Sequence, residues 1–257
     1  MTTSATENAP VVLITGAARR IGAATARVFH QNGYRVIIHY RHSATDALAL
    51  QYDLNKNLDK NRPHSATTLQ ADLDDPQAVL SLARDAMDCF GRIDVLVNNA
   101  SAFFPTAVGS ITQQQWDDLF NSNARAPLFL SQALTAALRE SHGSIVNLTD
   151  MNADRGMEGF TPYTMAKAAL QAMTRSLAKE LAPEVRVNSV APGAILWPEH
   201  TNNANDLAEQ HARILAGIPA GRLGTEDDIA NTVFFLAHEA HYITGENIRV
   251  DGGRALT

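Results

Sequence analysis

Residues 15–22 read TGAARRIG, directly after the apolar run Val11–Thr15 and directly before a stretch of helical periodicity. Gly16 permits a tight turn there, and Gly22 permits a helix to pack closely on the strand. The N-terminus of that helix offers free N–H groups and a positive dipole end, which suit a pyrophosphate. Strand, glycine turn and helix in this order therefore predict a dinucleotide-binding βαβ unit, with a purely structural turn as the alternative.

The rest of the chain repeats this alternation of short apolar runs and longer helical stretches. Most of the runs are almost continuously apolar, as in a parallel sheet that is covered on both faces. Strands are predicted at Val11–Thr15, Arg35–Tyr40, Ala66–Gln70, Ile93–Val97, Ser144–Thr149, Val185–Val190 and Asn247–Asp251. Helices are predicted near 21–32, 44–58, 76–90, 112–139, 162–181 and 226–238. The pattern predicts an α/β fold with one doubly wound, Rossmann-type domain.

The composition is that of an ordinary globular protein, with 257 residues, 45% hydrophobic and 19% charged. A formal net charge of -6 and the lack of a Lys/Arg run give no support to binding of nucleic acid or an acidic membrane. No apolar stretch approaches the roughly 20 residues of a membrane helix. The single cysteine, Cys89, excludes an intrachain disulfide and fits a reducing compartment. We expect a soluble, cytoplasmic protein.

No Pro/Gly/Ser-rich linker or internal repeat divides the chain, so we expect one domain over residues 9–257. Residues 1–8 are polar and lack an apolar signal core, which predicts a disordered tail. The stretch 194–224 interrupts the regular alternation and mixes Trp197 and Pro198 with several Asn. We expect this stretch to cover the substrate.

The second predicted strand ends in HYRHS, residues 39–43. A site selective for NAD usually places an acidic residue here, which bonds the ribose 2′-hydroxyl and would repel a 2′-phosphate. Arg41, His42 and Ser43 stand here instead, with Arg19 in the glycine turn, and arginine forms charge-assisted hydrogen bonds with phosphate. The pattern predicts NADPH rather than NADH as the cofactor, and a basic surface turn is the alternative.

Further residues near strand ends suit the cofactor. Asp72, followed by Leu73, can accept a hydrogen bond from the adenine amino group, and Asn99-Ala100 can line the adenine-ribose side. Asp and Asn also end strands for reasons of turn formation alone. Arg20 stands where a glycine is usual and can reach the pyrophosphate or an anionic edge of the substrate. A solvated arginine is the alternative there.

The stretch TPYTMAK at residues 161–167 predicts the start of a helix that carries a catalytic pair. Thr161 can cap this helix, with Pro162 at its first position. Tyr163 and Lys167 are four residues apart and therefore share one face. The lysine ammonium and the helix N-terminus both favour the phenolate of Tyr163. Such a pair can deliver or take a proton near neutral pH, as hydride transfer requires.

Two more residues are candidates for the same site. Asp150 lies thirteen residues before Tyr163, at the end of the fifth strand, where ligands of open α/β sheets bind. A strand-ending Asp that bonds local backbone is the alternative. Asn123 precedes Pro127 by four residues, and proline has no N–H to bond the Asn123 carbonyl. That carbonyl can hold a water that leads protons to Lys167, unless the proline merely kinks the helix.

Together these residues resemble the short-chain dehydrogenase/reductase family over nearly the whole chain. The markers are TGAARRIG at 15–22, NNA at 98–100, Asn123, YTMAK at 163–167, PG at 192–193 and the closing ITG and VDGG within 243–253. The resemblance implies a seven-stranded parallel sheet with helices on both faces, a Tyr163–Lys167 proton-transfer pair and a homotetramer.

Two departures from the family's usual pattern indicate its pteridine reductase branch. The usual serine thirteen residues before the tyrosine is Asp150 here, and a usual glycine is Arg20. Similarity to the same branch extends to HYRHS at 39–43, NASAFFPT at 99–106 and VDGGRALT at 250–257. Similarity to bacterial dihydromonapterin and dihydrofolate reductases of this branch lies in RG at 155–156 and ILWPEH at 195–200. Which pterin is the substrate therefore stays open.

The resemblance implies site residues by position. Asp150 and Tyr163 would handle protons at the pterin ring with Lys167 assisting, and Phe103 would stack on the pterin opposite the nicotinamide. The expected catalytic residues are Asp150, Tyr163, Lys167 and Asn123. The expected substrate-binding residues are Arg20, Ser101, Phe103, Asp150, Tyr163 and Trp197. The expected cofactor-binding residues are Gly16, Arg19, Arg20, Ile21, Gly22, Tyr40, Arg41, His42, Ser43, Asp72, Leu73, Asn99, Ala100, Ser101, Tyr163, Lys167, Pro192 and Gly193.

The sequence thus predicts an NADPH-dependent reductase that takes a dihydropterin or dihydrofolate to its tetrahydro form. The nearest alternative is a carbonyl reductase of the same family, such as a 3-oxoacyl thioester reductase. Asp150 argues against it, because a carboxylate can donate to a carbonyl oxygen only when protonated. A non-catalytic NADP-sensing protein, the other alternative, has little need for Tyr163 and Lys167. No metal site is expected, since His238 and His241 lack the i,i+4 spacing of a zinc helix motif.

Overall fold

The structure is a computed structural model that describes residues 8–58, 62–195 and 211–257. Most of the predicted N-terminal tail lies outside the described residues. So does the middle of the stretch 194–224, including Trp197.

Seven strands form one parallel sheet in the order β3-β2-β1-β4-β5-β6-β7. Their bounds are β1 Val11–Ile14, β2 Arg35–Tyr40, β3 Ala66–Gln70, β4 Val95–Asn98, β5 Ser144–Leu148, β6 Arg186–Pro192 and β7 Asn247–Val250. The chain runs outward from β1 to β3 on one side and from β4 to β7 on the other, which is a doubly wound topology. The predicted sheet is confirmed, with every strand close to its predicted bounds.

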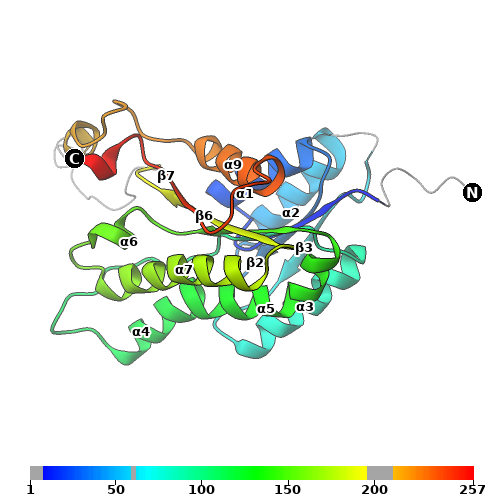
Figure 1. The fold of residues 1–257 in the computed structure, drawn as a ribbon, viewed down its shortest axis with the longest axis horizontal. Helices are drawn as coiled ribbons and strands as arrows, with labels where there is room; N and C mark the ends of the chain where they lie inside the picture. Colours follow the sequence, from blue (N-terminus) through cyan, green and yellow to red (C-terminus); the bar gives the residue numbers. More distant parts are fainter. Residues whose placement is uncertain (1–7, 59–61, 196–210) are drawn as a thin grey trace, which may run out of the picture.

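Helices cover both faces of this sheet, as Figure 1 shows. Their bounds are α1 Arg20–Gln31, α2 Ala44–Asp53, α3 Pro76–Phe90, α4 Gln113–Phe120, α5 Ala126–Glu140, α6 Asn152–Arg155, α7 Thr161–Glu180 and α9 Glu226–Phe234. The π-helical turns η1 Leu54–Leu58, η2 Asn121–Arg125 and η3 Phe235–Glu239 follow α2, α4 and α9, and a 3-10 turn spans Arg254–Leu256. Buried side chains of α1, α2 and α9 pack on one face of the sheet, and those of α3, α5 and α7 pack on the other.

The two faces of the sheet divide the core into two apolar clusters. Along β1, Val12 and Ile14 belong to one cluster, while Val11 and Leu13 belong to the other. All four side chains are fully buried. Successive side chains of a strand point to opposite faces, so a strand that is covered on both sides is apolar at every position.

The helix predicted near 112–139 is present as one continuous run of α4, the π-helical turn η2 and α5, with Pro127 at the second position of α5. A proline in a regular α-helix would remove a hydrogen bond and clash with the preceding turn, and the wider π-helical turn relieves this. The capping role predicted for Thr161 is wrong. Helix α7 starts at Thr161 itself, Phe160 is its N-cap residue, and Pro162 is at the second position.

The stretch 194–224 leaves the sheet after β6 and returns to the place where it started. The backbone N–H of Gly224 donates to the Ala194 carbonyl at 3.0 Å, which joins the two ends. The returning segment also contacts the chain end, since the Ala220 N–H donates to the Gly252 carbonyl at 2.9 Å. Figure 1 shows this segment beside the C-terminal turn, beyond the end of β7.

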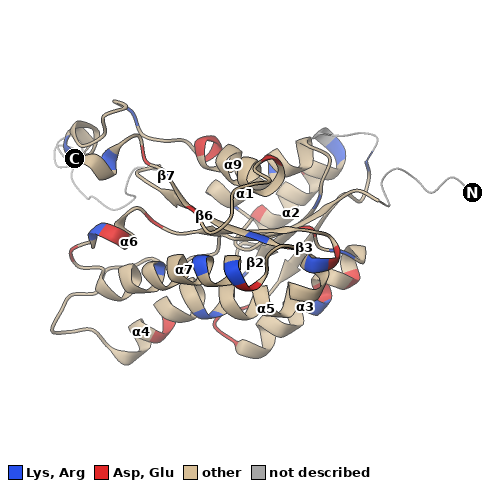
Figure 2. Cartoon of the chain, viewed as in Figure 1, with Lys and Arg blue, Asp and Glu red and all other residues tan. Residues whose placement is uncertain are grey.

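Charge is mixed over the surface of the described residues. Figure 2 shows positions of Lys and Arg interspersed with positions of Asp and Glu along the chain. Among the helices that the structure describes, none is long and apolar enough to span a membrane.

Candidate active site

The residues predicted to form the site follow the carboxyl ends of neighbouring strands. In a parallel sheet these ends meet at one edge, and ligands of open α/β sheets bind there. The structure places Gly16 after β1, Arg41 after β2, Asp72 after β3, Asn99 after β4, Asp150 after β5 and Gly193 after β6. Residues that are more than a hundred positions apart in the sequence are thereby brought to one edge of the sheet.

The glycine turn has the conformation that its sequence predicts. Gly16 has a φ of +62°, and a Cβ there would lie 2.9 Å from Ala100 Cα. A Cβ on Gly22 would collide with the Gly16 carbonyl oxygen. Arg20 also adopts a left-handed φ of +54°, a conformation that favours glycine and explains why a glycine is usual at this position. The turn is held open at a fixed shape before any ligand arrives.

His39 anchors this turn from the neighbouring strand. Its Nδ1 accepts the Gly16 N–H at 3.1 Å, and its Nε2 lies 3.2 Å from the Ala71 carbonyl. These partners require a neutral ring that carries its proton on Nε2. Burial lowers the pKa of His39 to about 4, which keeps the ring neutral. One side chain therefore ties together the ends of β1, β2 and β3.

Asn99 holds the same turn from β4. Its amide Nδ2 donates to the carbonyls of Thr15 and Gly16 at 2.8 and 3.0 Å, and its N–H donates to Thr15 Oγ1 at 3.0 Å. The Ala100 N–H donates to the same hydroxyl at 3.0 Å. The side chain of Asn99, which the sequence assigned to the adenine-ribose side, is thus committed to shaping the turn.

Arg41, which the sequence predicts to contact the 2′-phosphate, pairs with two carboxylates in the structure. Its Nη2 lies 2.9 Å from Asp72 Oδ2, and its Nη1 donates to Asp74 Oδ2 at 2.7 Å. Arg19, the other predicted phosphate contact, lies 3.8 Å from Asp46 in an exposed pair. His42 is exposed, and Ser43 is the N-cap residue of α2. The two arginines predicted to contact the 2′-phosphate, Arg19 and Arg41, are therefore both close to carboxylates.

The predicted catalytic residues converge. Tyr163 Oη donates to Asp150 Oδ2 at 2.7 Å, and Asp150 Oδ1 accepts the Asn152 N–H at 2.7 Å. Lys167 Nζ donates to the Leu148 carbonyl at 2.8 Å and lies 5.8 Å from the centre of the Tyr163 ring. Tyr163 is only 5% exposed and Lys167 only 3%. The end of β5 and the first turns of α7 thus form one buried acid-base cluster.

The electrostatics of this cluster correct one sequence prediction. Burial and then the Asp150 carboxylate raise the pKa of Tyr163 above its ordinary value. Burial lowers the pKa of Lys167 to about 8. In this state burial, and then the carboxylate in direct contact, outweigh the stabilisation of the phenolate that the sequence led us to expect from the ammonium. Tyr163 holds its proton near neutral pH, which suits proton donation.

Asn123 lies in the π-helical turn η2 and is fully buried. Its Oδ1 accepts the Ser101 hydroxyl at 2.7 Å, and its Nδ2 donates to the carbonyls of Ala102 and Leu119, both at 2.9 Å. The side chain fixes the segment after β4 that leads to Phe103. The predicted water relay through the Asn123 backbone carbonyl stays a prediction.

Phe103 belongs to an aromatic cluster beside Tyr163. Its ring stacks on Phe160 with centroids 4.7 Å apart and meets Tyr163 edge to face at 4.8 Å. Phe103 is nevertheless 54% exposed. An exposed aromatic face next to a proton donor offers a surface for a flat ring.

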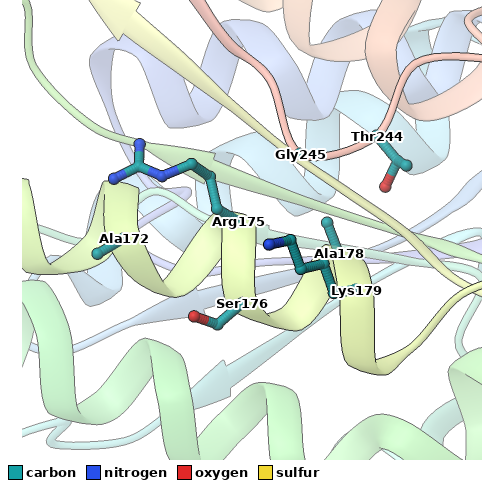
Figure 3. Close-up of a pocket in the computed structure, with 7 residues that line it drawn as sticks. All are labelled: Ala172, Arg175, Ser176, Ala178, Lys179, Thr244 and Gly245. Carbon is teal, nitrogen blue, oxygen red and sulfur yellow. The ribbon is translucent and has the colours of Figure 1, made fainter.

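A cavity of about 500 Å³ lies away from this cluster, and Figure 3 shows its lining. Arg175 and Lys179 of α7 contribute to it, together with Thr244 and Gly245 before β7. Lys179 is sixteen residues beyond Tyr163, or about 24 Å along the helix. The lining carries no carboxylate or phenol to pair with these cations, so this cavity is not the candidate active site.

Comparison with known proteins shows the family of this chain. A family model described as enoyl-(acyl carrier protein) reductase matches residues 16–255, from the glycine turn to the C-terminal 3-10 turn. The chain belongs to the short-chain dehydrogenase/reductase family. It is an oxidoreductase, as the members similar to it are.

Several family members resemble the chain along its whole length. Pteridine reductase 1 of Leishmania tarentolae is 39% identical, over 100% of this chain and 99% of the relative. The 3-oxoacyl-[acyl-carrier-protein] reductase of Staphylococcus aureus is 35% identical, over 94% of this chain and 96% of the relative. A crystal structure assigned as a short-chain alcohol dehydrogenase of Sinorhizobium meliloti superposes with a TM-score of 0.87 at 31% identity, over 96% of this chain and 97% of the other.

Three residues that contact the predicted site residues were not predicted from the sequence. His39 was read as part of a strand end, although a histidine between apolar strand residues signals a satisfied buried partner. Phe160 carried no motif. Asp74 lies 33 residues from Arg41 in sequence, and no local pattern links the two.

Proposed function

We propose that the protein is an NADPH-dependent reductase of pterins, which takes a dihydropterin or dihydrofolate to its tetrahydro form. The observation that carries the proposal is the direct hydrogen bond between Asp150 and Tyr163. The full-length similarity to a pteridine reductase supports it.

The residues at the sheet rim fit a dinucleotide. Helix α1 begins directly after the glycine turn, and its N-cap residue, Arg19, makes no side-chain cap hydrogen bond. The first N–H groups of α1 are therefore suited to a pyrophosphate held by Gly16, Ile21 and Arg20. Tyr163 and Lys167 would meet the nicotinamide end. When bound, NADPH supplies the hydride.

Reduction of a C=N bond also needs a proton on nitrogen, and the cluster can provide it. Tyr163 holds a proton that it shares with Asp150 across 2.7 Å. Both Asp150 oxygens accept hydrogen bonds, from Tyr163 and from the Asn152 N–H, which is the pattern of a carboxylate. We infer that the Asp150–Tyr163 pair delivers the proton to the ring and that Lys167, held by Leu148, balances its charge.

Substrate binding would use the exposed aromatic face at Phe103, with Ser101 and Arg20 close to both substrate and cofactor. Ser101 is already fixed by its bond to Asn123 at 2.7 Å. We also propose that the stretch 194–224 covers the bound substrate and that the protein acts in the cytoplasm as a homotetramer. Sedimentation of the purified protein would measure its assembly, and a monomer would contradict the last point.

A 3-oxoacyl thioester reductase is the second candidate, because a 3-oxoacyl-[acyl-carrier-protein] reductase is 35% identical to this chain. Tyr163 can serve as the proton donor in either reaction, so the two candidates differ at residue 150. A carbonyl oxygen favours a neutral second donor there, whereas Asp150 accepts hydrogen bonds at both oxygens. The pterin proposal is favoured for this reason.

The decisive assay incubates the purified protein with NADPH or NADH and dihydropterins, dihydrofolate or a 3-oxoacyl thioester. We expect oxidation of NADPH with the pterin or folate and little with the thioester. Reduction of the thioester alone would overturn the proposal.

A variant pair sharpens this test. Asp150→Ser should lower pterin turnover by about a hundredfold, the lower end of what a positioned acid-base group contributes. Asp154→Ser, the same change at an exposed position of α6, should leave turnover unchanged and serves as the control. Equal rates for both variants would mean that Asp150 is structural.

A further inference from the structure

Arg41 is held at the sheet rim by several contacts. Its guanidinium bridges Asp72 and Asp74 through two different nitrogens, at 2.9 and 2.7 Å. Its backbone carbonyl accepts the Gln70 side-chain amide at 2.9 Å. The end of β2 and the end of β3 are thereby joined on the side where the adenosine half of a dinucleotide would lie.

Asp74 is fixed even more firmly than Arg41. Its N–H donates to Asp72 Oδ1 at 3.0 Å, and its carbonyl accepts Arg125 Nη2 at 2.6 Å. Within the described residues, the second carboxylate oxygen of Asp74 is buried and accepts no hydrogen bond. The Asp74 side chain is 23% exposed, against 47% for Arg41. The backbone of Asp74 is therefore held at two points, and of the two paired side chains that of Arg41 is the more exposed.

The charges of this trio matter for a 2′-phosphate. The two guanidinium groups of Arg41 and Arg125 balance the carboxylates of Asp72 and Asp74. Asp118 of α4 adds a carboxylate close enough to act on Asp74, so the whole group carries a net negative charge. A phosphate approaching Arg41 would meet that repulsion and would compete with Asp74 for the same N–H donors. The 2′-hydroxyl of NADH carries no charge and meets neither obstacle.

We propose that Asp74 is a specificity-determining residue, which weakens binding of the 2′-phosphate by engaging Arg41. The inference rests on the proposed use of Arg41 in cofactor binding and deepens it. Asp74 then sets how strongly the protein discriminates NADPH from NADH.

The test measures binding of the cofactor alone by calorimetry, without a substrate. Asp74→Asn keeps the shape of the side chain and removes its charge. We expect it to tighten NADPH binding about tenfold, the effect of removing one charge near a phosphate in a partly solvated site. NADH binding should change by less than about twofold, within the scatter of additive effects. Adenosine 2′,5′-bisphosphate against adenosine 5′-monophosphate should reproduce this difference with the adenosine end alone.

Three further variants complete the experiment. Asp88→Asn removes one negative charge at an exposed position of α3, about 18 Å along the helix from its first residue, Pro76. It should leave the affinities for NADPH and NADH unchanged. Arg41→Ala should reduce the effect of Asp74→Asn to the part that charge repulsion alone contributes, since two residues that act through one contact are not additive. Asp74→Ser, with a smaller neutral side chain, repeats the test if Asp74→Asn does not fold.

The outcomes are distinguishable from those of the pterin assay. An unchanged NADPH to NADH affinity ratio, weaker NADPH binding, or an effect of undiminished size in Arg41→Ala would each overturn the role of Asp74. Failure to reduce any pterin would overturn the proposed function and leave the binding comparison valid.

Discussion

The two ends of the candidate site are built differently. At the reacting end, Tyr163 and Lys167 are almost fully buried and each donates a hydrogen bond to a fixed acceptor. At the adenosine end, Arg41 is half exposed and divides its guanidinium between two carboxylates. Burial makes protonation states and positions hard to change, while exposed ion pairs exchange partners at little free-energy cost. The reacting end is therefore suited to proton transfer, and the adenosine end is suited to discrimination between cofactors.

The largest effect should come from the reacting end. Tyr163→Phe removes the hydroxyl that donates to Asp150, and kcat should fall by about a thousandfold, within the range for a positioned proton donor. Cofactor affinity measured by calorimetry should change little. Tyr242→Phe, at a fully exposed tyrosine, is the matched control. Retention of a tenth or more of the activity would remove Tyr163 from the proton path.

A smaller effect should appear in the pH profile. Burial lowers the pKa of Lys167 to about 8, so the ammonium is lost as the pH rises through that value. If the charge of Lys167 supports proton delivery, kcat should fall by up to about tenfold per pH unit above it. Lys167→Arg should flatten this limb because arginine stays charged. Lys179→Arg, on the exposed side of the same helix, should retain the wild-type profile.

The smallest effect should come from the support of the glycine turn. His39→Ala removes an acceptor from the Gly16 N–H and should lower the free energy of unfolding by about 1–3 kcal/mol, with a modest rise in the KM for cofactor. His241→Ala, an exposed histidine, is its control.

The pH dependence of stability tests the same contact. The folded pKa of His39, about 4, is below the ordinary 6.5, so the unfolded chain binds more protons between these values. The contribution of His39 to stability is therefore complete above pH 6.5 and is lost as the pH falls toward 4. Denaturant unfolding of wild type and His39→Ala should converge as the pH falls; a constant difference would mean that the ring is not neutral in the fold.

Sequence reasoning succeeded where the information is local. The strands and the glycine turn follow from apolar runs and from two glycines, and Tyr163 and Lys167 follow from helical spacing. Contacts between segments that are distant in the sequence could not be predicted from it. The pairing of Arg41 with Asp74 depends on how β2 and β3 lie together, and the stacking of Phe103 on Phe160 depends on two loops. The protonation state of Tyr163 was misjudged because burial, which sets it first, is a property of the fold.

The hydrogen bond between Gly224 and Ala194 has a consequence for how such a protein can diversify. Because it closes the stretch on itself, insertions or exchanges between these residues need not disturb the strand register or the acid-base cluster. A change in the sequence between these two residues would then alter the range of substrates while the sheet and the acid-base cluster stay the same.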